Sequence, residues 1–130
     1  MLTWQPAVHG LGIGEMDATH EEFVQQVDTL ARASDADFPI LFDRFATHTQ
    51  RHFDNESRLM RACRFPAVAE HENEHRRVLG ELAYMRRAVA EGRTKLARIY
   101  ATQGLPDWFI HHLVTMDAAL AACLRRQENN

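Results

Sequence analysis

Histidine and carboxylate side chains recur along this chain at spacings that suit metal coordination. Five of the eight histidines and two acidic residues fall on four separate amphipathic stretches. The pattern predicts one buried site for two metal ions, built from His20, His52, Glu56, His71, His75, His112 and Asp117. Imidazole and carboxylate groups suit iron, and neither cysteine falls within the pattern to favour zinc or an iron–sulfur cluster.

The spacing within each stretch tests whether its residues can share a site. Residues four apart stack on one helix face, and two pairs have this spacing: His52 with Glu56, and His71 with His75. His112 and Asp117 are five apart, which on an ideal helix rotates one from the other by about 140°. The fourth stretch therefore needs either a wide inward face or a local widening of the π type.

These polar residues lie on stripes whose other members are apolar. A single inward histidine is most simply a core residue with a hydrogen-bond partner. A set that is spread over four helices is different, because only a shared charge centre compensates all of its members together. His48 lies on the same stripe, one turn before His52. We expect it to be a buried histidine supporting the ligands or, in a sharper hypothesis, a proton donor to the centre.

Length and composition limit the class of protein. A chain of 130 residues is predicted to form one domain, residues 1–130. Its formal net charge of -3 gives no basic footprint for nucleic acid. There is no apolar run long enough for a bilayer and no signal-peptide pattern at the N-terminus. Two cysteines are too few for a disulfide framework, so a reduced, cytoplasmic protein is expected.

The apolar periodicity predicts an all-α protein with four helices. Residues 1–16 are expected as a loop, and the helices at about 17–33, 39–63, 67–91 and 106–126. Asp17 is the expected N-cap of the first helix, and Gly92 ends the third. Pro106 should interrupt a helix, so residues 94–103 are expected as a separate short helix.

Several motifs follow one another along the chain: Trp4, Asp17-Ala18-Thr19-His20, His52-Phe53-Asp54-Asn55-Glu56, His71 to His75, and Trp108-Phe109-Ile110-His111-His112 before Asp117. In this order and at these spacings, they resemble the hemerythrin family, and within it the single-domain bacteriohemerythrins. The resemblance covers nearly the whole chain, and all seven ligand positions of the family pattern are occupied.

The resemblance implies an up-down-up-down four-helix bundle with a di-iron centre in its core. It implies that Glu56 and Asp117 bridge two iron ions together with an oxo or hydroxo group. One iron would then be completed by the three histidines of the last two helices, His71, His75 and His112. The other would be held by His20 and His52 and would keep an open position for dioxygen.

The function implied is reversible binding of dioxygen for storage, delivery or sensing, by a protein that is not an enzyme. Dioxygen is the expected ligand, with neither nucleic acid nor membrane as a partner. A separate protein that receives O2 or senses the oxygenated state is a further possible partner. The expected walls of the O2 pocket are Phe23, Trp108, Phe109 and Leu113. Phe109 is bulkier than the aliphatic residue expected in the family, so it should narrow access for O2.

Three other functions would use some of the same residues. A di-iron peroxidase or oxidase would use the same residues but consume O2 or peroxide. His71-Glu72-Asn73-Glu74-His75 is also a literal H-E-x-x-H, the signature of zinc hydrolases, but that hypothesis leaves the other five candidate ligands unexplained. A ferritin-like ferroxidase needs Glu-x-x-His on two helices, and only Glu72 to His75 matches.

Overall fold

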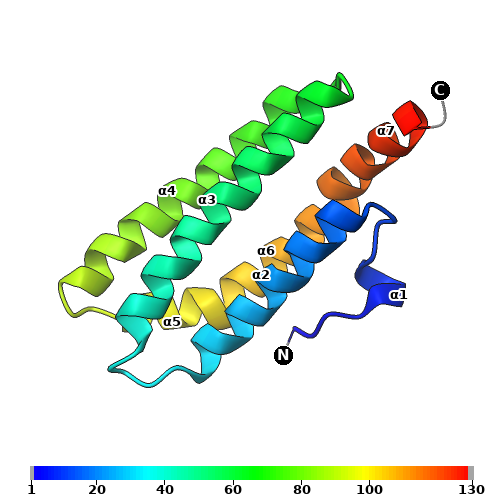
Figure 1. The fold of residues 1–130 in the computed structure, drawn as a ribbon. Coiled ribbons are helices and arrows are strands. Elements are labelled where there is room, and N and C mark those ends of the chain that lie inside the picture. Colours follow the sequence, from blue (N-terminus) through cyan, green and yellow to red (C-terminus); the bar gives the residue numbers. More distant parts are fainter. Residues whose placement is uncertain (1, 129–130) are drawn as a thin grey trace.

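Helices account for all of the regular secondary structure in the computed structural model, which describes residues 2–128. A short helix α1 (Pro6–His9) precedes three long helices, which are α2 (Gly14–Arg32), α3 (Phe38–Ala62) and α4 (Val68–Ala90). Helix α3 packs against both α2 and α4, and neighbouring helices run in opposite directions (Figure 1). No helix in the described range is long and apolar enough to span a bilayer.

The fourth rod of the bundle is one helical run with two changes of pitch. It consists of α5 (Lys95–Ile99), the π-helical η1 (Tyr100–Gly104), α6 (Leu105–His112), the π-helical η2 (Leu113–Asp117) and α7 (Ala118–Glu128). Its α6 part lies along α2 (Figure 1). The arrangement confirms the predicted all-α four-helix bundle.

The fourth rod differs from the expectation of a separate short helix before Pro106. The chain stays helical from Lys95 through the proline, because the turn before it is widened. In η1 the Leu105 N–H donates to the carbonyl of Tyr100, five residues back. The rod therefore passes the position where Pro106 lacks an N–H donor without ending.

The first long helix also begins earlier than expected, at Gly14 rather than near Asp17. Asp17 does not act as its N-cap. Its carboxylate instead accepts hydrogen bonds from the backbone N–H of Leu11, at 2.8 Å, and of Gly12, at 3.3 Å. Asp17 therefore fixes the loop that precedes the helix. In this loop Gly12 has a positive φ of 79°, which glycine adopts without strain. The loop expected over residues 1–16 also contains the short helix α1, which was not predicted.

Two apolar clusters fill the bundle, one towards each end. The larger includes Phe23, Phe42, Phe45, Phe53, Val78, Leu82, Leu105 and Leu113. The smaller includes Met16, Leu59, Met60, Phe65, Leu120 and Leu124. On α3, the buried Glu56 comes between Phe53 of one cluster and Leu59 of the other. His20 falls between the two clusters in the same way on α2, so a polar layer divides the core.

Candidate metal centre

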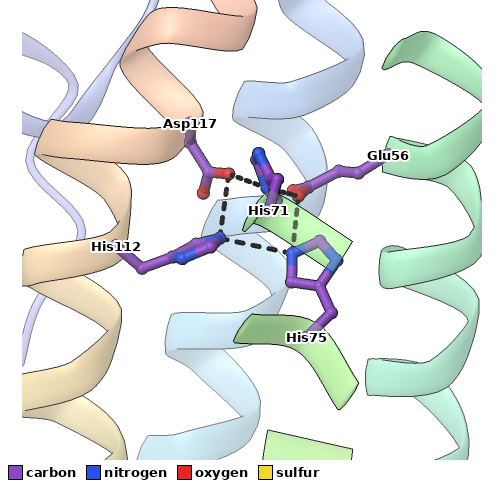
Figure 2. A group of neighbouring side chains, drawn as sticks. All are labelled: Glu56, His71, His75, His112 and Asp117. Atoms are coloured by element: carbon purple, nitrogen blue, oxygen red, sulfur yellow. Dashed lines mark hydrogen bonds and ion pairs between the residues drawn. The ribbon is translucent and has the colours of Figure 1, made fainter. Parts of the chain in front are cut away.

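Five buried side chains from three rods converge in this polar layer (Figure 2). Each offers one ligand atom within 4.8 Å of every other, and they are Glu56, His71, His75, His112 and Asp117. A sixth, His20 on α2, joins them: its Nε2 lies 3.2 Å from Glu56 Oε2 and 3.1 Å from Asp117 Oδ2. Six of the seven predicted residues are thus in one group, drawn from all four rods.

The two carboxylates divide their oxygens between two sides of the group. Glu56 Oε1 lies 3.1 Å from Nε2 of both His71 and His75, while Oε2 faces His20. Asp117 follows the same rule, because its Oδ1 lies 3.2 Å from His71 and His112 and its Oδ2 faces His20. The three histidines of α4 and α6 therefore form one side, and His20 forms the other.

The π-helical turn η2 lets the fourth rod contribute two residues. His112 ends α6 and Asp117 ends η2, and both are buried against the group. The Ala118 N–H donates to the carbonyl of Leu113, five residues back, as in a π-helix. The awkward five-residue spacing is therefore resolved by a local widening and not by a broad inward face.

Aromatic rings pack against the imidazoles. The Phe53 ring is parallel to His75, with centroids 3.8 Å apart and planes 1° apart. Trp108 stacks on His112 at 4.6 Å and 21°. Its indole N–H donates to Glu74 at 2.7 Å, so α4 also holds the stacking ring in place. These contacts fix the ring planes that aim the Nε2 atoms inward.

Burial and charge act in opposite directions on the pKa values of the group. Burial lowers the pKa of His20, but the Asp117 and Glu56 carboxylates outweigh it and raise this pKa to about 10. The same balance raises the pKa of His71 to about 9. Burial prevails at His75, whose pKa is lowered. In the carboxylates, burial is outweighed by the surrounding imidazoles, which hold the pKa of Glu56 well below its usual range.

The donor set fits a bound cation better than it fits a network of hydrogen bonds. The Nε2 atoms of His75 and His112 face each other at 3.2 Å. Within residues 2–128, Asp117 Oδ1, which lies 3.2 Å from the Nε2 atoms of His71 and His112, has no hydrogen-bond partner. The outward Nδ1 atoms of His20, His71, His75 and His112 also have none in this range. Buried polar groups are normally paired, and carboxylates only accept. A metal ion would satisfy the converging lone pairs together, and imidazole with carboxylate is a set that suits iron.

His52 lies at the edge of the group and not within it. Its Nε2 is 3.4 Å from Glu22 Oε2, and 14% of its side chain is exposed. Burial lowers its pKa against the opposing charge of Glu22. His48, expected to be inward, is instead half-buried, with 36% of its side chain exposed, and contacts Glu22 and Gln26. Sequence reasoning missed Glu22, and its only signal is the position two residues after His20.

The four expected pocket residues lie on two sides of the group. Phe23 and Phe109 are stacked at 4.8 Å, and the Phe109 ring meets His20 edge-on at 5.6 Å. Leu113 is fully buried beside them in the larger cluster. Trp108 lies on the other side, against His112. The side of the group near His20 is therefore lined by apolar rings.

Glu72 of the H-E-x-x-H motif has other partners. Its carboxylate accepts a hydrogen bond from the Ser57 hydroxyl at 2.7 Å and pairs with Arg61 at 3.4 Å. A zinc hydrolase would need this group free to act as a base next to the metal. His71 and His75 instead converge with ligand types from two further rods, which disfavours that alternative.

Comparison with known proteins agrees with this geometry. The family model described as "Hemerythrin HHE cation binding domain" matches residues 11–124. A bacteriohemerythrin of Ralstonia nicotianae is 37% identical over 127 residues, covering 98% of this chain and 91% of the relative. One of Methylococcus capsulatus is 23% identical over 128 residues, covering 95% and 97%. A crystal structure of wild-type hemerythrin shares the fold with a TM-score of 0.86, at 23% identity and coverage of 95% and 98%. The chain belongs to the hemerythrin family.

Proposed function

We propose that this protein binds dioxygen reversibly at a non-haem di-iron centre in the middle of the bundle. The observation that carries the proposal is the division of the two carboxylates, each of which turns one oxygen to the His71 side and the other to His20. A group that presents two sets of donors across shared carboxylates suits two ions better than one. Relatives named bacteriohemerythrin support iron and dioxygen as the metal and ligand.

In this proposal Glu56 and Asp117 would each contribute to holding both ions, since each turns one oxygen to either side of the group. The three histidines of one side, His71, His75 and His112, would hold the first ion. His20 and His52 would hold the second. His52 is at present paired with Glu22, so ligation requires its imidazole to exchange that carboxylate for the metal.

Two iron(II) ions would supply an open coordination position and the two electrons that dioxygen takes up on binding and returns on release. The chain's own part is to shape and dry the pocket. Phe23, Phe109 and Leu113 are almost completely buried beside His20, so they exclude water and reductants from that side. Trp108 acts differently, since it holds the plane of His112.

A di-iron oxidase or peroxidase remains the competing function, because it would use the same ligands. The donor set favours binding, since it has five histidines and only two carboxylates, whereas carboxylate-rich sites suit oxygen activation. Storage, delivery and sensing would all begin with the same binding event. Which of them applies depends on the partner that receives O2 or responds to it.

Absorption spectroscopy of the reconstituted protein tests the proposal. The metal-free protein is loaded anaerobically with iron(II), counted for metal, exposed to O2 and then flushed with argon. We expect about two irons per chain and a visible charge-transfer band that appears with O2 and disappears without it. Irreversible bleaching to a ferric form would instead indicate an oxidase. A single tightly bound zinc with no iron uptake would overturn the di-iron proposal.

A further inference from the structure

A second group of metal-ligand types lies at the solvent edge of the centre. Glu22 on α2 faces two histidines of α3: its Oε1 lies 3.6 Å from His48 Nδ1, and its Oε2 lies 3.4 Å from His52 Nε2. The exposed fraction of the side chain falls from 48% at Glu22 to 36% at His48 and 14% at His52. The three residues thus form a series from solvent towards the interior.

This edge is the most accessible side of the candidate centre. The other six candidate ligands have side chains that are at most 7% exposed. His52 is at least twice as exposed as any of them. It also lies close enough to Glu56 and His20 to be affected by their charges. An ion that reaches His52 is therefore beside the buried group.

The Gln26 side chain contacts both residues of the outer pair, Glu22 and His48. The Gln26 amide donates to Glu22 Oε1 at 3.4 Å and also contacts His48 Nδ1. His48 Nδ1 and the Glu22 carboxylate thus lie side by side. Imidazole nitrogen and carboxylate oxygen are the donor types that suit iron(II).

The geometry favours successive binding over a permanent third site. Each histidine faces a different oxygen of Glu22, His48 Nδ1 at 3.6 Å and His52 Nε2 at 3.4 Å. An ion could be held first between Glu22 and His48, with water completing its coordination, and then between Glu22 and His52.

We propose that Glu22 and His48 form the route by which hydrated iron(II) enters the protein and is passed to His52. Glu22 supplies the negative charge that attracts the ion and then moves it inward by exchanging one carboxylate oxygen for the other. The inference rests on the proposed di-iron centre, and it assigns residues that would not remain ligands once both ions are in place.

The rate of anaerobic iron(II) uptake tests this route. Metal-free protein is mixed with iron(II), and unbound ion is trapped at timed intervals with a colorimetric chelator. Glu22→Gln and His48→Gln should each slow uptake, by about tenfold for the loss of charge at Glu22, while the iron bound at completion stays at two per chain. Glu21→Gln is the matched control, because it removes the same charge from the neighbouring exposed position, and its rate should equal that of the unmodified protein.

Salt and the double variant provide independent readouts. Uptake by the unmodified protein should slow with ionic strength more steeply than uptake by Glu22→Gln. A variant that carries both Glu22→Gln and His48→Gln should take up iron little more slowly than the slower of the two single variants, since both residues act on one route. Equal rates in Glu22→Gln, Glu21→Gln and the unmodified protein, each with two irons bound, would overturn the route alone. A chain that binds no iron at any time would instead overturn the proposed centre.

Discussion

Ring contacts orient each of the four histidines that lack a partner at Nδ1. His20, His71, His75 and His112 contact, in that order, Phe109, Phe65, Phe53 and Trp108. Metal-ligating histidines usually donate the second ring nitrogen to a carboxylate or carbonyl, which sets the ring orientation. Packed aromatic rings contribute to that orientation here, so the shape of the core helps to aim the candidate ligands.

The bridging assignment predicts a specific loss of metal. Glu56→Ala removes the carboxylate that contacts His20, His71 and His75, so iron content should fall to one per chain or less. Metal analysis after anaerobic loading measures the effect. Glu72→Ala is the matched control, because Glu72 contacts Ser57 and Arg61 outside the group. Two irons retained in Glu56→Ala would contradict the assignment.

Phe109 should control access of O2 to the centre. Replacing it with Leu opens space next to His20 and removes the ring stacked on Phe23. We expect faster O2 association and faster loss of the oxygenated spectrum, since water also gains access. Stopped-flow absorption measures both rates. Phe65→Leu changes a ring beside His71 and should leave the O2 association rate unchanged, and equal acceleration in both variants would argue against a specific role.

At the scale of the element, the π-helical turn η2 makes the centre compatible with a continuous fourth rod. Without the widened turn, His112 and Asp117 would point about 140° apart. With it, α6 packs its apolar side chains into one core cluster and α7 packs into the other, while both polar residues face the layer between them. The extra residue of η2 is therefore needed to build the site, although most side chains of this turn do not belong to the group.

Deleting one residue from η2 tests this dependence on length. Thr115 is exposed, and its hydroxyl donates only to the His111 carbonyl, at 2.6 Å. Deletion of Thr115 should restore an ordinary turn and rotate Asp117 and α7 by about 100° relative to α6. Iron content and thermal stability should both fall. Thr115→Ala keeps the length and should retain both, and a deletion variant with two irons would show that the turn is dispensable.

Much of this element-scale organisation was predictable from sequence, and the exceptions have physical causes. The helices of the first three rods follow from apolar periodicity, and Gly92, with a φ of 85°, lies just beyond the end of α4 as predicted. The π-turn at Leu113–Asp117 was one of two alternatives that the five-residue spacing of His112 and Asp117 left open. The unbroken fourth rod was not predictable, because the π-turn at Tyr100–Gly104 has no distinctive local sequence. His48 was misplaced because helical periodicity gives a face, and does not say how far across that face the neighbouring helix extends.

At the scale of the whole molecule, the polar layer couples protonation to folding when metal is absent. The pKa values of His20 and His71 are raised to about 10 and about 9 by the neighbouring carboxylates, against the effect of burial. A raised pKa contributes stability that is complete below the unfolded value of 6.5 and is lost as pH rises through the folded value. Iron binding should replace those protons with metal charge.

Urea denaturation of the metal-free protein should therefore show falling stability between about pH 6.5 and pH 10. The iron-loaded protein should lose little over the same range, because its ligands are already deprotonated. Iron affinity should rise with pH for the same reason. Stability of the metal-free protein that stays constant or increases across this interval would show that the carboxylates do not hold protons on these two histidines.

The division of the core by a polar layer also bears on how the chain assembles. Apolar helices of similar length can pack in more than one register, since one leucine substitutes for another at modest cost. A layer of histidines and carboxylates on four rods removes that freedom, because a slipped helix would place charge against hydrocarbon and leave its partners unpaired. We expect only the correctly aligned bundle to bind its ions, so that metal uptake stabilises this helix register over slipped ones.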